Sequence, residues 1–224
     1  MRWLRASSTK NKQHARGALS RLYASQLPTD RMDVDKLKLL AVDIETTGLD
    51  AKRHQILSIA WVPIDGQRIE LAGAGSVLIQ PENMHDVGES ALIHHITDEM
   101  LAGGIPEQEA MTMLLDALSG RAMVAHFSAL EVSFINAACR RHFNADFDTR
   151  LVKVVDTFAL ERRHMERMGT YPRGEDLRLA RVRRRYGLPD YRSHNALSDA
   201  LACAELYLAL KEQSKAGTLK ALMN

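Results

Sequence analysis

Several features are scarce in this sequence of 224 residues, and each scarcity excludes a class of protein. The two cysteines, Cys139 and Cys203, lie far apart and fit neither a metal-binding nor a redox spacing, so we expect no disulfide framework and a cytoplasmic location. No apolar run approaches the ~20 residues of a membrane span, so no membrane partner is expected. Without internal repeats or low-complexity tracts, the chain is expected to form one globular domain with short extensions.

Acidic residues are absent from the first 29 positions, which carry six basic residues. A second basic segment, residues 161–192, has ten arginines and five acids, although the net charge of the whole chain is only +2. Two basic segments therefore flank an acidic body. Such clusters suit a polyanion such as nucleic acid, but solvated protein surfaces also carry them, and charge alone leaves both interpretations open.

The basic beginning of the chain has the composition of an organelle transit peptide, but Leu19, Leu22, Tyr23 and Leu27 are spaced to form an apolar helical patch. We favour an arm that is retained and docks on the body. The expected organisation is a basic N-terminal arm over residues 1–35, a main domain over 36–213 and a C-terminal tail over 214–224.

Apolar runs predict strands early in the chain. Residues 37–44 are apolar on both faces, which predicts a central strand covered by helices on either side. Further strands are predicted over 56–62 and 68–79, joined by a tight turn in which Asp65-Gly66 supplies the positive φ.

Helical patterns dominate after this hairpin. They predict a short helix near Ser90, one that Pro106 opens, and longer ones over 129–143 and 196–211; short strands are predicted over 121–126 and 152–155. Strands that alternate with helices after an initial hairpin predict an α/β fold with a mixed five-stranded sheet flanked by helices.

Two carboxylates stand at the end of the first predicted strand. In "LLAVDIETTGLD" (39–50), Asp43 and Glu45 are two positions apart, so their side chains point to the same face of the strand. A hard divalent cation such as Mg²⁺ or Mn²⁺ is the natural answer to their mutual repulsion. An isolated pair of this kind is more often a strand end that turns into solvent.

Another acidic residue stands near the end of the chain, in "SHNALSDALACAEL". His194 precedes Asp199 by five positions, which on a helix is a rotation of about 140°. We therefore place His194 in the loop before the helix and Asp199 in its first turn. Taken alone, Asp199 is explained as a partner of the helix dipole and His194 as an ordinary loop histidine.

Together with "HFSALE" (126–131), these motifs resemble the DEDDh branch of the DnaQ-like exonucleases, which have a ribonuclease H-like fold. "DIETTG" (43–48) matches the first family motif and "HNALSDA" (194–200) the third. The second motif, His-Asn-Ala-x-Phe-Asp, is altered, because Phe127, Leu130 and Glu131 replace Asn, Phe and the metal-binding Asp. Glutamate keeps the carboxylate and adds one methylene, a reach of about 1.5 Å, so we expect a metal-competent site.

The resemblance covers residues 37–210 and implies that the main domain is a metal-dependent 3′-to-5′ exonuclease releasing 5′-mononucleotides. The implied substrates are single-stranded DNA, RNA or short oligonucleotides, and the implied cofactors are two divalent cations, Mg²⁺ or Mn²⁺. His194 would be the general base, with Glu45 as the second catalytic residue. The implied metal ligands are Asp43, Glu45, Glu131 and Asp199, and the implied substrate-binding residues are Thr46, Thr47, Gly48, Leu49, Ile96 and Phe127.

Alternatives remain open for several of these residues. Gly48 is equally well explained by a turn, Ile96 by core packing and Phe127 by burial rather than base stacking. Asp156, in "VVDTFAL", is interpreted as structural. The arginine-rich stretch 173–185 is a candidate for binding backbone phosphates.

Two predictions concern the whole protein. The short sequence after Asp199 favours a stand-alone enzyme over a polymerase subunit. The competing hypothesis is a non-catalytic nucleic-acid-binding or scaffold protein on a degenerate exonuclease fold, which the altered second motif suggests. A dead site is expected to lose carboxylates, however, and all four are present.

Overall fold

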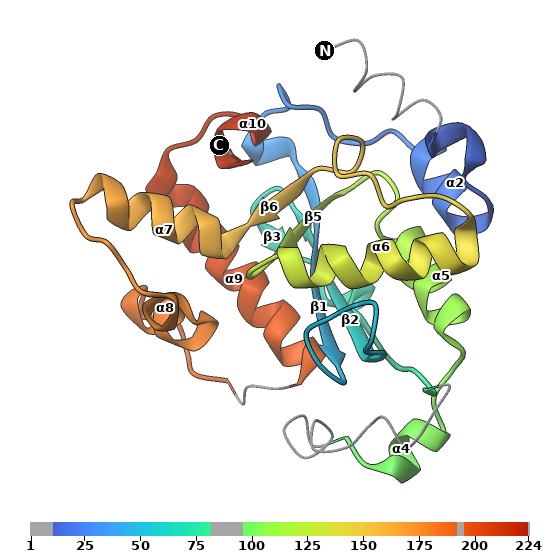
Figure 1. Ribbon diagram of the computed structural model, residues 1–224. Coiled ribbons are helices and arrows are strands. Elements are labelled where there is room, and N and C mark those ends of the chain that lie inside the picture. Colours follow the sequence, from blue (N-terminus) through green and yellow to red (C-terminus); the bar gives the residue numbers. More distant parts are fainter. Residues whose placement is uncertain (1–10, 82–95, 192–194, 224) are drawn as a thin grey trace.

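The computed structural model describes residues 11–81, 96–191 and 195–223, and it shows one mixed sheet between two layers of helices (Figure 1). The sheet has the order β3-β2-β1-β5-β6, and β4 pairs with β2 on the same edge as β3. Antiparallel pairing joins β1 to β2, whereas β1, β5 and β6 run parallel. The strands are β1 (Lys38–Thr46), β2 (Ile56–Asp65), β3 (Arg68–Ile69), β4 (Gly75–Leu78), β5 (Ala122–Ala125) and β6 (Val154–Asp156).

Strand β1 is central, as its two apolar faces predicted. Alternate residues enter different cores: Leu40 and Val42 pack in one cluster, and Leu39 and Ala41 in the other. A strand presents successive side chains to opposite faces, so a continuous apolar run fits a strand with helices on both sides.

Two groups of helices cover the sheet (Figure 1). The first core cluster contains side chains of α2, α5 and α6, and the second contains side chains of α7, α8, α9 and α10. The helices are α2 (Gly17–Ala24), α4 (Asp98–Ala102), α5 (Glu107–Ala117), α6 (Ala129–Phe143), α7 (Thr157–Arg167), α8 (Leu179–Arg185), α9 (Ala196–Ser214) and α10 (Leu219–Met223), with 3₁₀ turns η1 (Val34–Lys36), η2 (Leu71–Gly73) and η4 (Gly174–Leu177).

The α/β class and the helix-flanked mixed sheet are confirmed, but the sheet has six strands and not five. The predicted strand 68–79 is interrupted by η2, so its two ends form β3 and β4, which both pair with β2. Leu71, in the interruption, is 63% exposed, so its apolar character does not mark a buried strand position. A Cβ on Gly75 would lie 2.3 Å from the Trp61 ring, so only glycine lets β4 pass this side chain.

The turn between β2 and β3 is a confirmed prediction. Gly66 has a φ of 63°, and Asp65 pairs with Arg68 across a two-residue turn. The helix predicted near Ser90 lies outside the described residues. Within the described part of the chain, no helix is both long and apolar enough to cross a bilayer.

Both ends of the described chain pack against the body. In α2, Leu19 and Leu22 are fully buried in the core that α5 and α6 share. In α10, Leu219 and Leu222 are likewise buried beside β6. The helical patch predicted in the N-terminal arm is therefore present and docked, and a helix lies within the segment predicted to be a tail.

Candidate metal and active site

The carboxyl end of β1 presents two acids to the layer that contains α9. Asp43 and Glu45 continue the series of Leu39 and Ala41, which pack beneath α9. Asp199 lies in the first turn of α9, which begins after Asn195, whose side chain accepts a hydrogen bond from the Ser198 amide at 3.1 Å. Carboxylate oxygens of Asp43, Glu45 and Asp199 lie within 4.8 Å of one another.

The three carboxylates of this acidic cluster (Asp43, Glu45 and Asp199) repel one another when they are ionised. Burial raises the pKa of Asp43 well above its ordinary value, and the charges of Glu131, Glu45 and Asp199 raise it further. A raised carboxyl pKa means that the ionised form is disfavoured. A divalent cation bound among these oxygens would remove that penalty, and oxygen-rich sites of this kind suit Mg²⁺ or Mn²⁺.

Glu131 lies outside the group of three but belongs to the same electrostatic environment. It sits in the first turn of α6, in the opposite helix layer, and is 3% exposed. Its Oε2 has no hydrogen-bond partner among the described residues. Burial raises its pKa to about 8, and the charges of Asp156 and Glu45 act in the same direction. A buried carboxylate oxygen without a partner is unusual, and it fits a side chain that coordinates a cation.

Asp156 explains the local geometry where β5 passes into α6. One carboxylate oxygen accepts the Phe127 amide at 3.0 Å, and the other accepts the amide and hydroxyl of Ser128, each at 3.0 Å. The same side chain caps α7, because it accepts the Phe158 amide at 2.9 Å. These bonds account for Asp156 structurally, as the sequence interpretation had it.

His126, the first residue of the altered motif, is tied to two other elements. Its Nε2 lies 2.8 Å from the carbonyl of Leu177, and its Nδ1 lies 2.9 Å from the hydroxyl of Thr157. Burial lowers the pKa of the imidazole. Both ring nitrogens therefore have a polar partner, and His126 joins the end of β5 to α7 and η4.

The loop after β1 is organised by its own hydrogen bonds. The Thr46 hydroxyl donates to the Gly48 carbonyl at 2.7 Å, and the Thr47 hydroxyl accepts the Gln55 amide at 3.0 Å. A Cβ on Gly48 would lie 2.5 Å from the His54 ring, so glycine is required by this close approach. Sequence reasoning missed His54, because nothing in the motif indicates which later side chain covers the glycine.

The other predicted substrate residues differ in exposure. Leu49 is 82% exposed and Phe127 53%, whereas Ile96 is 7% exposed and packs with Leu57 and Leu101. Core packing therefore explains Ile96 without a substrate. His194 lies outside the described residues.

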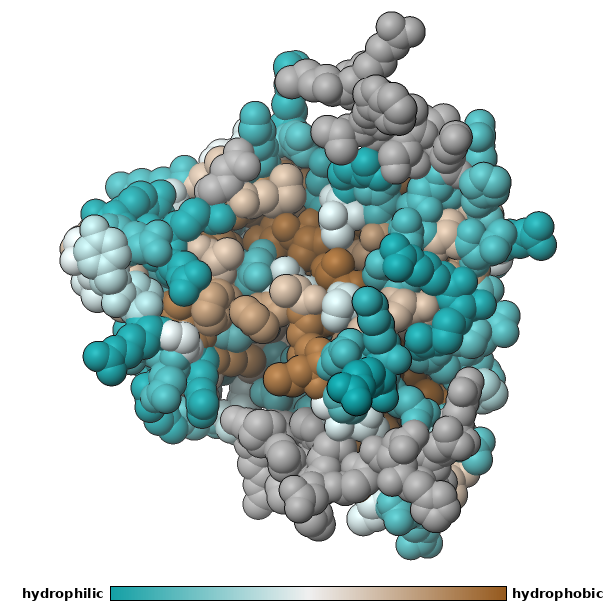
Figure 2. All heavy atoms as spheres, viewed as in Figure 1, coloured by the Kyte–Doolittle hydropathy of each residue, from teal (hydrophilic) through white to brown (hydrophobic). Residues whose placement is uncertain are grey.

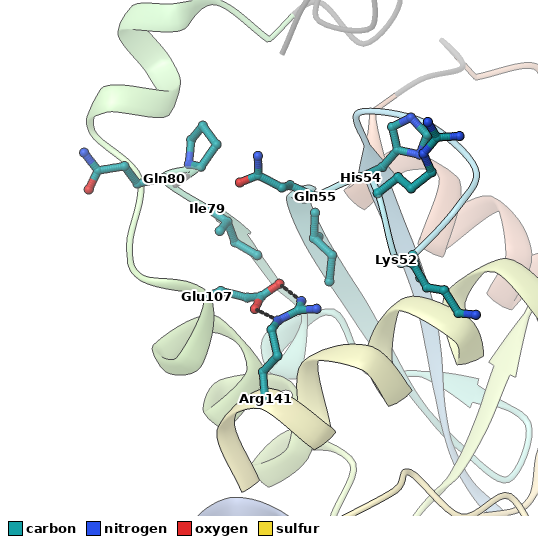
Figure 3. A pocket seen from close by; sticks show the side chains of 11 residues that line it. Lys52, His54, Gln55, Ile79, Gln80, Glu107 and Arg141 are labelled. Carbon is teal, nitrogen blue, oxygen red and sulfur yellow. Dashed lines mark hydrogen bonds and ion pairs between the residues drawn. The ribbon is translucent and has the colours of Figure 1, made fainter. Parts of the chain in front are cut away.

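A separate pocket of about 200 Å³ is lined in part by the β1–β2 loop (Figure 3). Lys52, His54 and Gln55 belong to its lining on the loop side, and Glu107 and Arg141 lie across from Gln55, joined by hydrogen bonds of 2.7 and 3.1 Å. No member of the acidic cluster lines this pocket. Its lining carries Lys52, Arg53 and Arg141 against the single acid Glu107, so it offers no group of carboxylates for a cation, and the acidic cluster remains the candidate metal site.

The arginine-rich stretch is mainly a structural element. Arg183 is 2% exposed and bonds the carbonyls of Ala202 and Pro189 at 2.6 and 2.8 Å and the carboxylate of Glu205 at 2.7 Å. Neighbouring arginines also have acidic partners: Arg181 pairs with Glu175 and Asp176, Arg184 with Asp190, and Arg185 with Glu161. The predicted role in phosphate binding is therefore wrong for Arg183, whose guanidinium is inaccessible.

Comparison with known proteins agrees with the motifs. The exonuclease family called RNase_T matches residues 40–207. The DNA polymerase III subunit epsilon of Treponema pallidum (strain Nichols) is 31% identical over 173 residues, which cover 76% of this chain and 74% of that protein. The DNA polymerase III PolC-type protein of Lacticaseibacillus paracasei is 28% identical over 81% of this chain, which spans only 12% of that relative's length.

Among solved structures, E. coli exonuclease I in complex with a dT13 oligonucleotide superimposes with a TM-score of 0.67. The match covers 80% of this chain and 42% of the exonuclease I chain, at 14% identity. At that identity the likeness concerns the fold, and it confirms the predicted ribonuclease H-like architecture.

Proposed function

Because the chain belongs to the RNase_T exonuclease family, which covers residues 40–207, we propose that it hydrolyses the terminal phosphodiester at the 3′ end of single-stranded nucleic acid or short oligonucleotides. The products are 5′-mononucleotides. One observation carries the proposal: Asp43, Glu45 and Asp199 bring carboxylate oxygens within 4.8 Å of one another, and the pKa of Asp43 is raised by burial and by its acidic neighbours.

The residues present fit a pair of divalent cations, Mg²⁺ or Mn²⁺. Asp43, Glu45, Asp199 and Glu131 would hold them. The partnerless, buried Oε2 of Glu131 supports this assignment, because no protein group satisfies it among the described residues. When bound, the cations activate a water molecule and stabilise the leaving 3′ oxygen.

The protein side chains have separate tasks in this mechanism. His194 takes the proton from the attacking water, as its ordinary pKa near ~6.5 suits. The β1–β2 loop receives the terminal nucleotide: the Thr46 hydroxyl holds the loop shape, the Thr47 hydroxyl retains its proton for the sugar, and Leu49 lies against the base. Leu49 is 82% exposed, so its side chain is accessible to such a base.

We further propose that residues 36–213 form the catalytic domain, that the basic arm precedes it, and that the protein acts in the cytoplasm. The proposed substrate class is supported by the family and by the likeness to exonuclease I, which was solved in complex with a dT13 oligonucleotide. Ile96 is proposed to support the wall of the nucleotide pocket from behind, because it packs on Leu57 in the core.

The test is digestion of a single-stranded oligonucleotide labelled at its 5′ end, with Mg²⁺ or Mn²⁺ present. We expect a ladder of products shortened one nucleotide at a time, and no ladder from Asp43→Asn. Asp116→Asn is the matched control, because Asp116, on α5, forms an exposed ion pair with Arg21 of α2. If the unmodified protein binds the strand but never shortens it, the non-catalytic binding protein is the correct assignment. Competition among DNA, RNA and dinucleotides then defines the substrate.

A further inference from the structure

Phe127 has a backbone conformation that aromatic residues rarely adopt. Its φ is 68°, in the left-handed region that favours glycine and asparagine. The family pattern has asparagine at this position, so the substitution exchanged a residue that tolerates this conformation for one that does not. Strained residues of this kind persist where the surrounding structure imposes them, and they concentrate at binding and catalytic sites.

The strained conformation is held by Asp156. The carboxylate of Asp156 accepts the amides of Phe127 and Ser128, both at 3.0 Å, and is itself fixed at the start of α7. The backbone at residue 127 therefore cannot relax without giving up its hydrogen bond to Asp156. As a consequence, the direction of the Phe127 side chain is determined by the scaffold.

That direction leads outward and not into the core. Phe127 is 53% exposed, although large aromatic side chains are usually well buried. Its ring meets Phe158 at a centroid distance of 5.2 Å and an interplanar angle of 66°, and the Arg162 guanidinium lies 5.5 Å from the Phe158 ring centroid. The Phe127 ring is thus supported by Phe158 and remains accessible to solvent.

Phe127 also lies at the edge of the sheet that carries the acidic cluster. Strands β1 and β5 are parallel neighbours, so their carboxyl ends lie at the same edge of the sheet: Glu45 stands near the end of β1, and Phe127 follows two residues after the end of β5. Figure 2 shows hydrophobic residues gathered in the middle of the face where Figure 1 places the amino-terminal end of α6. An apolar floor of this kind suits a nucleobase more than a phosphate.

We propose that Phe127, in this protein's altered second motif, stacks on the base of the second nucleotide from the 3′ end. The inference depends on the proposed exonuclease function. Leu49 and the β1–β2 loop, on the β2 side of β1, receive the terminal nucleotide, so a strand that crosses the site brings its next base to the β5 side. Stacking on an aromatic ring is tolerant of base identity because every base has a π face.

The experiment compares hydrolysis of an intact oligonucleotide with that of one carrying a single abasic site, placed in turn at the first, second and third positions from the 3′ end. For the unmodified protein, we expect the abasic site at the second position to raise KM about tenfold, the size of one base–aromatic contact. The value of kcat is expected to change little, because the contact exists before and during the reaction.

Three variants identify the ring as the cause. Phe127→Asn removes both the ring and the backbone strain, and Phe127→Leu keeps the strain and the apolar bulk but lacks a π face. Both should bind the intact and abasic strands equally, with KM at the level of the abasic substrate. Phe127→Trp should keep the unmodified protein's ratio. Asparagine suits the left-handed backbone, so loss of the fold is not expected, and circular dichroism checks this.

The outcomes separate this inference from the proposed function. If the unmodified protein hydrolyses the strand but Phe127→Asn or Phe127→Leu keeps the full dependence on the second base, stacking by Phe127 is wrong and the exonuclease assignment stands. If no abasic position changes KM, the same conclusion follows. If the unmodified protein releases no nucleotides, the proposed function fails, and this inference fails with it.

Discussion

Two charged regions of this protein differ in whether their charges are paired with charges of the opposite sign. The acidic cluster at the end of β1 gathers charges of one sign, and its members raise the pKa of Asp43. In the arginine-rich stretch of η4 and α8, the four arginines of α8 each form an ion pair with an acidic residue. Arg183 is buried among hydrogen-bond acceptors. The fold pairs most of the arginines of this stretch with acids, whereas it brings carboxylates of like charge together in the acidic cluster. The comparison supports the proposal that a cation binds in the acidic region.

The largest expected effect is at the centre of the acidic cluster. Asp43→Asn should lower kcat by at least about 1,000-fold, because a group that acts on the reacting atoms is lost. In the unmodified protein, added Mg²⁺ should raise Tm by binding the native state, and Asp43→Asn should abolish that rise. Mononucleotide release and thermal denaturation with and without EDTA measure both. An Asp43→Asn protein with normal activity would contradict the role of the cluster.

The arginine stretch should respond in stability and not in activity. Arg183→Met leaves Glu205 without its buried partner and two carbonyls without donors, and we expect the free energy of unfolding to fall by about 3 kcal/mol. Arg184→Met removes only an exposed ion pair with Asp190 and should change it by less than about 0.5 kcal/mol. Urea denaturation of the two variants gives the difference. Equal effects would mean that Arg183 is no more structural than its neighbour.

Glu131 tests whether the altered second motif contributes to the acidic site. Glu131→Gln keeps size and shape but not charge, and it should reduce kcat by about 50-fold. Glu131→Asp, which restores the family residue, should remain within about tenfold of the unmodified protein because a carboxylate is still present. Rates at several Mg²⁺ concentrations measure both variants. Full activity of Glu131→Gln would remove Glu131 from the ligand set.

His126 gives a pH dependence that belongs to the scaffold. Burial lowers its native-state pKa, so the unfolded chain binds a proton more readily than the native protein. Below the unfolded value of about 6.5, stability should therefore decline as pH falls towards the lowered native pKa. Urea denaturation at pH 7.5 and pH 5.5 should show a smaller decline for His126→Gln than for the unmodified protein. His14→Gln, at an exposed position, is the control and should retain the full decline.

The smallest expected effect concerns the rim of the acidic site. Leu49→Ala should raise KM about fivefold through the loss of one apolar contact with the terminal base. Leu71→Ala is the matched control, because Leu71 is also an exposed leucine, 63% against 82%, but lies in η2 on the connection between β3 and β4. Neither change should alter stability measurably. An equal rise in KM for both variants would mean that Leu49 makes no specific contact.

Much of the fold was predictable because it depends on local patterns. The helix predicted over 129–143 coincides with α6, and the two-residue turn at Gly66 formed as its positive φ required. The strand predicted over 68–79 was wrong in its middle, because alternating apolar residues there do not reveal that Leu71 faces solvent or that Gly75 must pass Trp61. Such contacts join distant parts of the chain, and a local pattern contains no information about them.

The sequence by itself determined the family and the side of β1 that carries the acids: the motif order identifies the family, and the two-residue spacing of Asp43 and Glu45 requires a shared face. Only the tertiary structure decided which charges meet. The buried guanidinium of Arg183 is satisfied by α9 and its surroundings, whereas Asp199 is brought from the far end of the chain to the oxygens of Asp43 and Glu45. The physical reason is that a charge acts through its neighbours in space, and folding selects those neighbours.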